Sequence, residues 1–443
     1  MSGDWSRSAL TFLIAIILAY LIIGTLFAVY TPAWQAPDEP AHYNYIRYLA
    51  EQKRLPILQY GDYPHGYLRA IVSSGFPSTL SIDPIRYEFH QPPLYYLLAV
   101  PMFWSFDGAL LPLRLLSVML GAGLVYVAFR VAWAACPAQP LVALGTAALV
   151  AFVPMHTAMT AAVNNDTLAE LLLALALWRL VAYARGRTEG RSLALVGLIL
   201  GLGLLTKIYA FIGVGSGVVV VWLRRRDNWR QALREWAWLL LPALALILPW
   251  LVRNAAVYGW PDLMGLMRHD TVVEGQPTTV QWIADYGWRY LIGEGLRTTF
   301  HSFWGKFGWM AVVMDRRFYL TLGAFVAVAA VGLMAWLTTL RRDRAARQQH
   351  GVLLALLALQ ACLTLLAYVW YNTKYVQHQG RYLFPALAPI GLAVAQGWWT
   401  LAGGVRRWMG DWVEGLFAAP FVGLAALDLF CLFGYVVPFL SSG

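Results

Sequence analysis

The sequence predicts an all-α membrane protein, a polytopic bundle of about eleven spanning helices, and three observations lead to this fold class. Hydrophobic residues make up 60% of the 443 residues and charged residues only 13%, with a mean hydropathy of +0.57. Soluble domains carry about a quarter charged residues. The apolar residues form segments long enough to cross a bilayer, and arginines gather between these segments. We therefore treat residues 1–443 as a single transmembrane domain.

The predicted spans follow one another unevenly, and no internal repeat is visible. The first follows Arg7 and has no small-residue cleavage site, so we expect a retained helix. Residues 92–106 are apolar but short and begin with two prolines, and we expect an interfacial or re-entrant helix there. The predicted spans are residues 10–30, 111–134, 141–160, 168–184, 192–206, 208–223, 236–251, 318–340, 352–370, 383–401 and 413–437.

Basic residues between the spans predict the orientation. Cytoplasmic loops of membrane proteins are enriched in arginine and lysine. Counting residues 92–106 as a full span would place the arginine-rich loops outside. We therefore predict a cytoplasmic N-terminus in the plasma (inner) membrane and two large outer loops, residues 31–110 with interfacial helices and residues 253–317. The arginines behind this argument are Arg185, Arg187, Arg191, Arg224, Arg225, Arg226, Arg341, Arg342, Arg344, Arg347, Arg406 and Arg407.

Several functional classes find no support in the sequence. The net charge of +10 comes from basic residues beside apolar segments, which is typical of membrane topology and not of nucleic-acid binding. Cys136, Cys362 and Cys431 fall in a short inner connection and in two predicted spans, so no disulfide is expected in an outer loop. No phosphate-binding glycine loop, nucleophile elbow or pair of metal-binding cysteines is present.

Acidic residues follow the first span directly. Pro40 suits the first turn of a helix, so Asp38 and Glu39 would lie at a helix N-terminus, where free amides and the helix dipole keep carboxylates ionised. An ionised carboxylate can act as a base, and His42 is close in sequence. The alternative is that both acids only cap the helix.

A second acidic turn has the sequence Asn164-Asn165-Asp166. Asn165 or Asp166 can cap the helix that follows, which would explain the turn without a function. The predicted topology places Asp166 on the same side of the membrane as Asp38. Both carboxylates could then approach one substrate or one divalent cation, since hard cations prefer oxygen ligands.

Three basic residues are candidates for binding a phosphate at the outer face. Lys207 interrupts an apolar stretch, where a charge is costly without a partner. Arg253 directly follows a predicted span, and Arg381 begins another. Lys207 and Arg253 could instead reach the lipid head groups, and Arg381 could instead bind loop carbonyls. Asp428 lies inside the last predicted span and should face the bundle, paired or protonated.

The order of these motifs resembles the GT-C superfamily of membrane glycosyltransferases. The likeness covers most of the chain and rests on the Asp38-Glu39 pair, on His90-Gln91-Pro92-Pro93-Leu94-Tyr95-Tyr96, and on the turn at Asp166. It is strongest to the protein O-mannosyltransferase and aminoarabinose-transferase branch. Bacterial membrane proteins of unassigned function are more similar still, because they share Gly305-Lys306-Phe307-Gly308-Trp309 and Gln379-Gly380-Arg381-Tyr382 as well.

The resemblance implies transfer of a sugar, hexosyl or pentosyl, from a polyprenyl-phosphate donor to an extracytoplasmic acceptor, with inversion. Asp38 would be the general base, and Glu39 and Asp166 are the other candidate catalytic residues. The implied phosphate-binding residues are Lys207, Arg253 and Arg381. His42, Asp166 and His90 are candidates for orienting the acceptor or for holding a divalent cation, Mg²⁺ or Mn²⁺.

Two other functional classes remain open. A transporter or flippase of a lipid-linked glycan would use the same basic groups but would need alternating access in place of a carboxylate base. A noncatalytic subunit of a membrane assembly would use the 21 tryptophans as contact surface. The long acidic first loop favours the enzyme. The sugar, the acceptor and the oligomeric state do not follow from the sequence.

Overall fold

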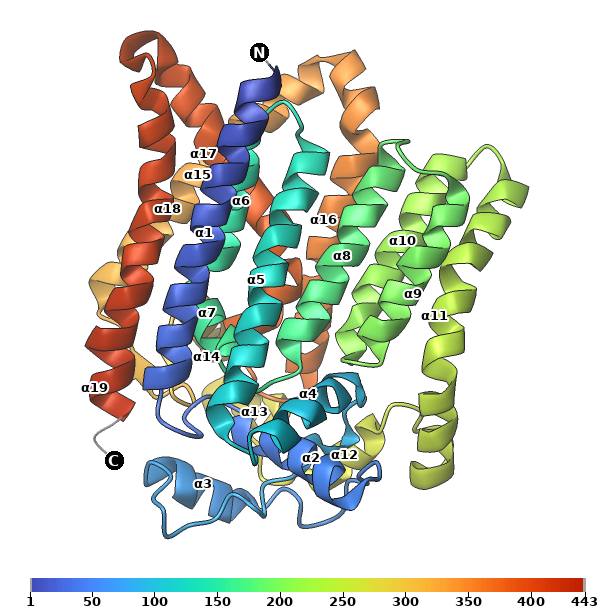
Figure 1. Cartoon of the computed structure of the whole chain (residues 1–443), viewed down its shortest axis with the longest axis vertical. Coiled ribbons are helices and arrows are strands. Elements are labelled where there is room, and N and C mark those ends of the chain that lie inside the picture. The colour runs from blue at the N-terminus through green and yellow to red at the C-terminus, as the bar shows by residue number, and fades with distance from the viewer. Residues whose placement is uncertain (1, 441–443) are drawn as a thin grey trace.

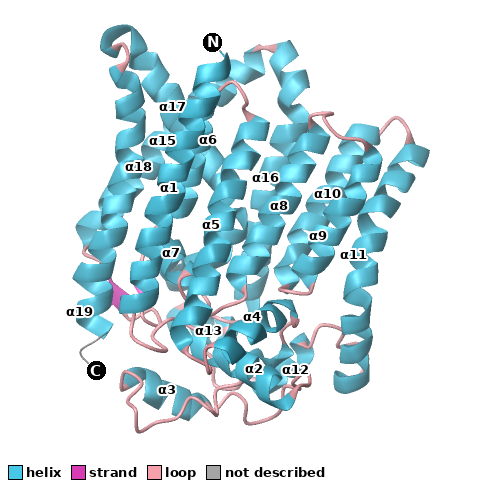
Figure 2. Ribbon diagram, in the orientation of Figure 1, coloured by secondary structure: helices cyan, strands magenta, loops and turns pink. Residues whose placement is uncertain are grey.

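The computed structural model describes residues 2–440 and is helical almost throughout (Figures 1 and 2). Within that range, a short antiparallel hairpin pairs β1 (Lys306–Phe307) with β2 (Val312–Val313). The predicted all-α fold class is confirmed. The long helices run side by side along one axis, as they would across a membrane (Figure 1).

Within residues 2–440, eight helical segments are long and apolar enough to cross a membrane, or nine if a bent pair is one span. The bent pair, α6 (Pro140–Ala151) and α7 (Pro154–Thr160), turns by 64°. The predicted number of eleven is not confirmed, because α9 (Leu193–Leu204) is short and α17 (Leu387–Met409) is not among the eight; both lie beside the long helices in Figure 1. The eight segments are formed by α1 (Ser2–Tyr30), α5 (Leu110–Ala135), α8 (Asp166–Ala184), η3 (Ile208–Ala210) with α10 (Phe211–Arg225), α11 (Trp229–Tyr258), α15 (Arg316–Arg342), α16 (Arg344–Lys374) and α18 (Trp412–Cys431), the last continued by η5 (Leu432–Val436) and α19 (Val437–Leu440).

The two ends of the bundle differ in character. The N-terminus and the arginine-rich connections between α8 and α9, α10 and α11, α15 and α16, and α17 and α18 lie at one end (Figure 1). The opposite end, here called the loop end, carries short helices joined by long loops, and α19 also lies there. An odd number of crossings fits this arrangement. The remaining short helices are α2 (Glu39–Gln52), α3 (His65–Ser73), η1 (Tyr87–His90), α4 (Leu94–Ser105), η2 (Gly190–Ser192), η3 (Ile208–Ala210), α12 (Leu266–Val272), α13 (Thr279–Tyr286), α14 (Trp288–Trp304) and η4 (Gly380–Ala386).

Close helix packing and lipid-facing side chains both follow from composition. A Cβ on Gly332 of α15 would lie 2.0 Å from the Gly397 carbonyl oxygen of α17, so only glycine allows these helices to approach. On the outer surface of the bundle, Leu241, Val331 and Leu366 are exposed, as expected for residues that face lipid. The helix at residues 94–105 contacts α2 at the loop end and lies across the long helices in Figure 1, in agreement with its assignment as a helix that does not span.

The bend between α6 and α7 exposes backbone carbonyls that side chains satisfy. His156 Nδ1 lies 2.8 Å from the Val150 oxygen, and the Thr157 hydroxyl lies 3.0 Å from the Ala151 oxygen. Each side chain also contacts an acid on a neighbouring helix. His156 Nε2 lies 3.0 Å from Glu170 of α8, and the Thr157 hydroxyl lies 2.8 Å from Asp428 of α18. Asp428 therefore faces the bundle and is hydrogen bonded, as predicted.

Candidate active site

Asp38 lies at the corner between α1 and α2 in an unusual conformation. Its φ of 68° and ψ of −8° are left-handed, which non-glycine residues seldom adopt without a compensating role. The side chain makes no capping hydrogen bond to α2. Instead, Tyr87 donates its hydroxyl proton to Asp38 Oδ1 at 2.7 Å, and Arg381 donates to Oδ2 at 2.6 Å. The capping alternative is thus wrong for the side chain of Asp38.

Glu39 points elsewhere and is held by Arg114 of α5. Both guanidinium contacts are short, 2.7 Å from Nε and 2.6 Å from Nη2, and both residues are buried. Arg114 also donates to the carbonyls of Ala28, Thr31 and Pro32 at the end of α1. The pair therefore fixes the corner that carries Asp38. We assign Glu39 to positioning because its oxygens are already occupied.

Arg381 reaches the corner from the far end of the sequence. Its Nε donates to Gln379 Oε1 at 2.7 Å, which orients the guanidinium, and its side chain is only 8% exposed. Gly380 allows this segment to touch α14, because a Cβ there would lie 2.3 Å from the backbone atoms of Thr299 and Phe303. Packing of η4 against α14 thus places the Arg381 side chain next to Asp38.

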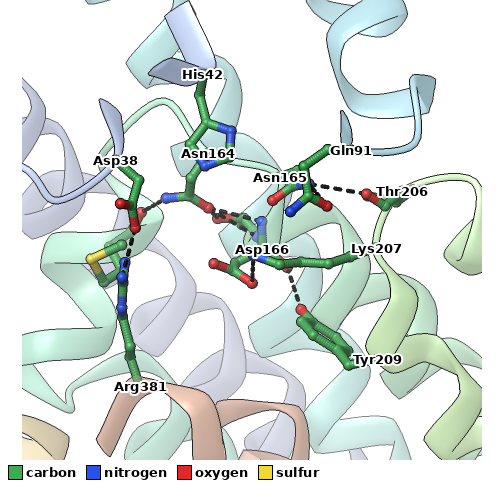
Figure 3. A network of polar contacts seen from close by, with 12 residues as sticks. Asp38, His42, Gln91, Asn164, Asn165, Asp166, Thr206, Lys207, Tyr209 and Arg381 are labelled. Carbon is green, nitrogen blue, oxygen red and sulfur yellow. Dashed lines mark hydrogen bonds and ion pairs between the residues drawn. The ribbon is translucent and has the colours of Figure 1, made fainter. Parts of the chain in front are cut away.

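A second carboxylate and cation lie nearby, where α8 begins and α9 ends (Figure 3). Lys207 Nζ is 2.7 Å from Asp166 Oδ1, and the two side chains are 18% and 24% exposed. Asn164, and not Asn165 or Asp166, provides the side-chain cap of α8, since its Oδ1 accepts from the Asp166 and Thr167 amides. Asn165 Nδ2 donates to the Thr206 carbonyl at 3.0 Å, which ties the α8 turn to the α9 turn that carries Lys207.

The two ion pairs share one electrostatic environment. Burial alone would raise the pKa of Asp38, but the charge of Arg381, the His42 ring when protonated at low pH, and the hydrogen bonds from Tyr87 and Arg381 lower it to about 2. Burial disfavours the charged form of Lys207, yet the nearby Asp166 and Glu88 carboxylates outweigh it and raise the pKa. Asp38 and Lys207 are therefore both charged at neutral pH.

The two predicted histidines line the same region. His42 is buried, its Nδ1 lies 2.8 Å from the Tyr96 hydroxyl, and burial lowers its pKa. His90 is also buried and its Nδ1 lies 2.9 Å from the Tyr87 carbonyl, so that nitrogen carries the proton. Burial and the nearby His269 lower the pKa of His90 well below its usual value. Both rings are neutral at pH 7.

Arg253 does not contact the two ion pairs. It lies within α11, which continues to Tyr258, beyond the predicted end at residue 251. Its guanidinium donates to Asn254 Oδ1 at 2.8 Å and to the Pro56 carbonyl, and it stacks on Trp250 at 4.9 Å. These contacts are to protein groups, and neither of the two predicted partners of Arg253, a phosphate or the lipid head groups, is visible in them. The described contacts give no support to a phosphate-binding role for Arg253.

The sequence interpretation missed Tyr87 and Arg114. Arg114 had a signal, because an arginine inside a predicted span is costly unless it meets an acid. Tyr87 had none, since tyrosines are common near membrane interfaces.

The carboxylates predicted as ligands of a divalent cation contact side-chain cations in the structure. Asp38 and Asp166 each contact a side-chain cation within 2.7 Å. Among the described residues, no three His, Cys, Asp or Glu side chains are placed to hold a metal ion. A divalent cation at this site stays a prediction.

The fold resembles solved membrane glycosyltransferases of the GT-C superfamily. ArnT from Cupriavidus metallidurans, in the apo state, superimposes with a TM-score of 0.53 and 14% identity over 98% of this chain and 74% of that chain. The same enzyme bound to undecaprenyl phosphate gives 0.52 and 14%, with 100% and 74% covered. The Archaeoglobus fulgidus oligosaccharyltransferase, tethered to an acceptor peptide, gives 0.53 and 10% over 97% of this chain, which spans about half, 55%, of that protein.

Sequence comparisons add the family. A search of curated proteins found no match. The model of the family described as predicted membrane protein (DUF2142) matches residues 84–390, which is more than half of the chain and includes Asp166, Lys207 and Arg381. This protein therefore belongs to the DUF2142 family of membrane proteins and has a GT-C-like fold.

Proposed function

We propose that this protein transfers a sugar from a polyprenyl-phosphate donor to an acceptor hydroxyl at the outer face of the plasma membrane, with inversion at the anomeric carbon. The observation that carries the proposal is the pairing of two carboxylates with two cations at the loop end of the bundle, Asp38 with Arg381 and Asp166 with Lys207. Transfer from a lipid phosphate needs both kinds of group, cations for the phosphate and a carboxylate for the hydroxyl proton.

In the resting state each cation is already paired. Donor binding exchanges Asp38 for phosphate on Arg381, whereas Lys207 keeps Asp166 because its ammonium has three donors. The phosphate of the donor takes hydrogen bonds from Arg381 and Lys207, which are held in place through Gln379 and through the Asp166 turn. After the effect of burial, the charge of Arg381 has the largest effect on the pKa of Asp38. As Arg381 turns to the phosphate, the pKa of Asp38 rises from about 2 toward its ordinary value, and Asp38 becomes a stronger base.

The chemical step is a single displacement at the anomeric carbon. The acceptor oxygen attacks the anomeric carbon from the face opposite the phosphate, and the hydroxyl proton passes to Asp38. The new bond joins the acceptor oxygen to the anomeric carbon, and the bond from that carbon to the phosphate oxygen breaks. The lipid phosphate leaves with the electron pair and one more negative charge, which Arg381 and Lys207 stabilise. Asp166 keeps Lys207 oriented throughout.

The structural neighbours support this kind of function without identifying the substrates. One ArnT structure contains undecaprenyl phosphate, and the oligosaccharyltransferase is tethered to an acceptor peptide. A lipid-phosphate donor and an acceptor outside the cytoplasm suit a loop end that lies opposite the arginine-rich connections. The experiment below distinguishes hexosyl from pentosyl donors, and its source of acceptor contains proteins, lipids and polysaccharides.

The experiment measures release of lipid phosphate from a radiolabelled panel of polyprenyl-phosphate sugars by the full chain in lipid vesicles, with solubilised cell envelope as the source of acceptor. We expect one donor to be consumed by the wild type and by Asp285→Asn, which changes an exposed outer acid of α13. Asp38→Asn should bind this donor without consuming it.

Three results would contradict the proposal. Consumption that survives in Asp38→Asn would remove Asp38 as the base. Failure of the wild type to bind any polyprenyl phosphate would remove the function. Transfer of uncleaved donor across the vesicle membrane, unaffected by Asp38→Asn, would instead favour a transporter of lipid-linked glycans.

A further inference from the structure

Glu88 is a carboxylate of the site that neither the motifs nor the proposed reaction uses. It lies in η1, next to Tyr87, and its Oε2 is buried without a hydrogen-bond partner among the described residues. Its charge acts on His42 and Lys207, raising the pKa of each, so it faces the same region as the two ion pairs. Asp38, Glu39 and Asp166, in contrast, all have cationic partners.

Asn165 supplies a second acceptor of the same kind. The residue is completely buried, and its Nδ2 donates to the Thr206 carbonyl, which fixes the orientation of the amide. Its Oδ1 is buried and has no hydrogen-bond partner among the described residues. Asn165 directly precedes Asp166, and Thr206 directly precedes Lys207, so this oxygen lies beside the second ion pair.

Buried acceptors without donors are unfavourable, and folded proteins keep few of them. Where two occur beside cations that can bind a phosphate, a ligand that brings hydrogen-bond donors would satisfy them. Glu88 also determines which ligands are excluded. Asp38 balances Arg381 and Asp166 balances Lys207, so Glu88 leaves the site with one uncompensated negative charge, which would repel an acidic group on the ligand.

We propose that Glu88 and Asn165 bind hydroxyl groups of the donor sugar, next to its phosphate on Lys207, and that they select sugars without an acidic substituent. This inference rests on the proposed function. A carboxylate can accept from two neighbouring hydroxyls at once, and the Asn165 oxygen accepts from a third. Neutral and amino sugars fit this arrangement, and a uronic acid does not.

The test is a binding measurement, so that it does not depend on turnover. The full chain in lipid nanodiscs is titrated with polyprenyl phosphate alone, with its hexosyl derivative and with the matching hexuronosyl derivative. We expect the wild type to bind the hexosyl lipid at least about tenfold more tightly than the hexuronosyl lipid. The uronic acid would lose a hydrogen bond to the charged Glu88, and its carboxylate would be repelled by Glu88. Glu88→Gln should reduce this preference to about twofold or less, since glutamine keeps the shape without the charge. Glu274→Gln, at an exposed glutamate of the other large outer loop, should leave it unchanged.

Each outcome is decisive. A preference for the hexosyl over the hexuronosyl lipid that persists in Glu88→Gln, or that is absent from the wild type, overturns the inference. If the wild type still binds polyprenyl phosphate in either case, the proposed function is not contradicted. In another outcome, Glu88→Gln binds the hexosyl lipid normally, still discriminates against the hexuronosyl lipid, and yet loses turnover. That result would make Glu88 the base and would overturn its assignment to sugar binding. Failure of the wild type to bind any of the three lipids overturns both the inference and the proposed function.

Discussion

Removal of the Asp38 carboxylate should strengthen binding of bare polyprenyl phosphate. In the resting site Asp38 and the incoming phosphate compete for the guanidinium of Arg381, since Oδ2 already lies 2.6 Å from Nη2. Asp38→Asn weakens the internal competitor and leaves Arg381 in place. Most substitutions of a charged active-site residue weaken ligand binding, so an increase is a distinctive expectation.

The magnitude follows from the environment of Asp38. A pKa that falls from 3.8 to about 2 corresponds to about 2.4 kcal/mol in favour of the charged carboxylate, at about 1.36 kcal/mol for each pH unit. Tyr87 contributes part of this, and the Asp38 side chain is 24% exposed, so solvent screens the pair to some extent. Assigning about 1.4 kcal/mol to competition for Arg381 predicts about tenfold tighter binding.

The assay is displacement of a fluorescent polyprenyl phosphate from the protein in nanodiscs. Asp285→Asn serves as the control, because it removes one outer acid that is exposed. Arg381→Gln should weaken binding in the same assay. Unchanged or weaker binding by Asp38→Asn would refute the idea that the phosphate and the carboxylate exchange on Arg381. The ion pair would then be structural, and the phosphate would bind elsewhere.

Three further predictions concern stability, measured as the melting temperature in detergent. Arg114→Met should destabilise the fold by about 3–5 kcal/mol, because it leaves the buried Glu39 without its partner. The double variant with Glu39→Leu should recover much of this loss, and no recovery would contradict the pairing. Gly380→Ala should cost about 1–3 kcal/mol through contact with the α14 backbone, whereas Gly293→Ala, which has open space around it, should not; equal effects would contradict the packing argument. The lowered pKa of His42 means that, as the pH falls, the unfolded chain takes up a proton before the folded chain does. The His42 contribution to the melting temperature is therefore complete above pH 6.5 and is lost as the pH falls below that value. His42→Gln should flatten this pH dependence, and an unchanged slope would mean that other groups cause it.

Composition and local chemistry were sufficient to predict much of the architecture. Long apolar segments and interspersed arginines predicted the bundle and its two unlike ends, and Pro40 predicted the start of α2. The helix ends were less well predicted. α11 runs to Tyr258, seven residues past the predicted end at residue 251, because the chain remains helical beyond its apolar part.

The partners of the charged residues could not be predicted. Asp38 and Arg381 are 343 positions apart, and their contact depends on how η4 packs against α14 and the first corner. Adjacent acids are also ambiguous in sequence. Asp38 and Glu39 point to different partners because Asp38 adopts a left-handed backbone, whereas Glu39 is the first residue of α2. Only the packed structure separates their roles.

The break between α6 and α7 also bears on how the protein is made. α6 has 12 residues, fewer than the roughly 20 that a span requires, so it depends on α7 to cross the bilayer. His156 meets Glu170 only 14 positions later, soon after synthesis of α8 begins. Thr157 meets Asp428, 271 positions later, in the last long helix. Ribosomes synthesise the chain from its N-terminus, so this hydrogen bond forms only after residue 428 has been made. Until then Thr157 lacks its link to α18, and α18 packs beside a bend that was synthesised long before it.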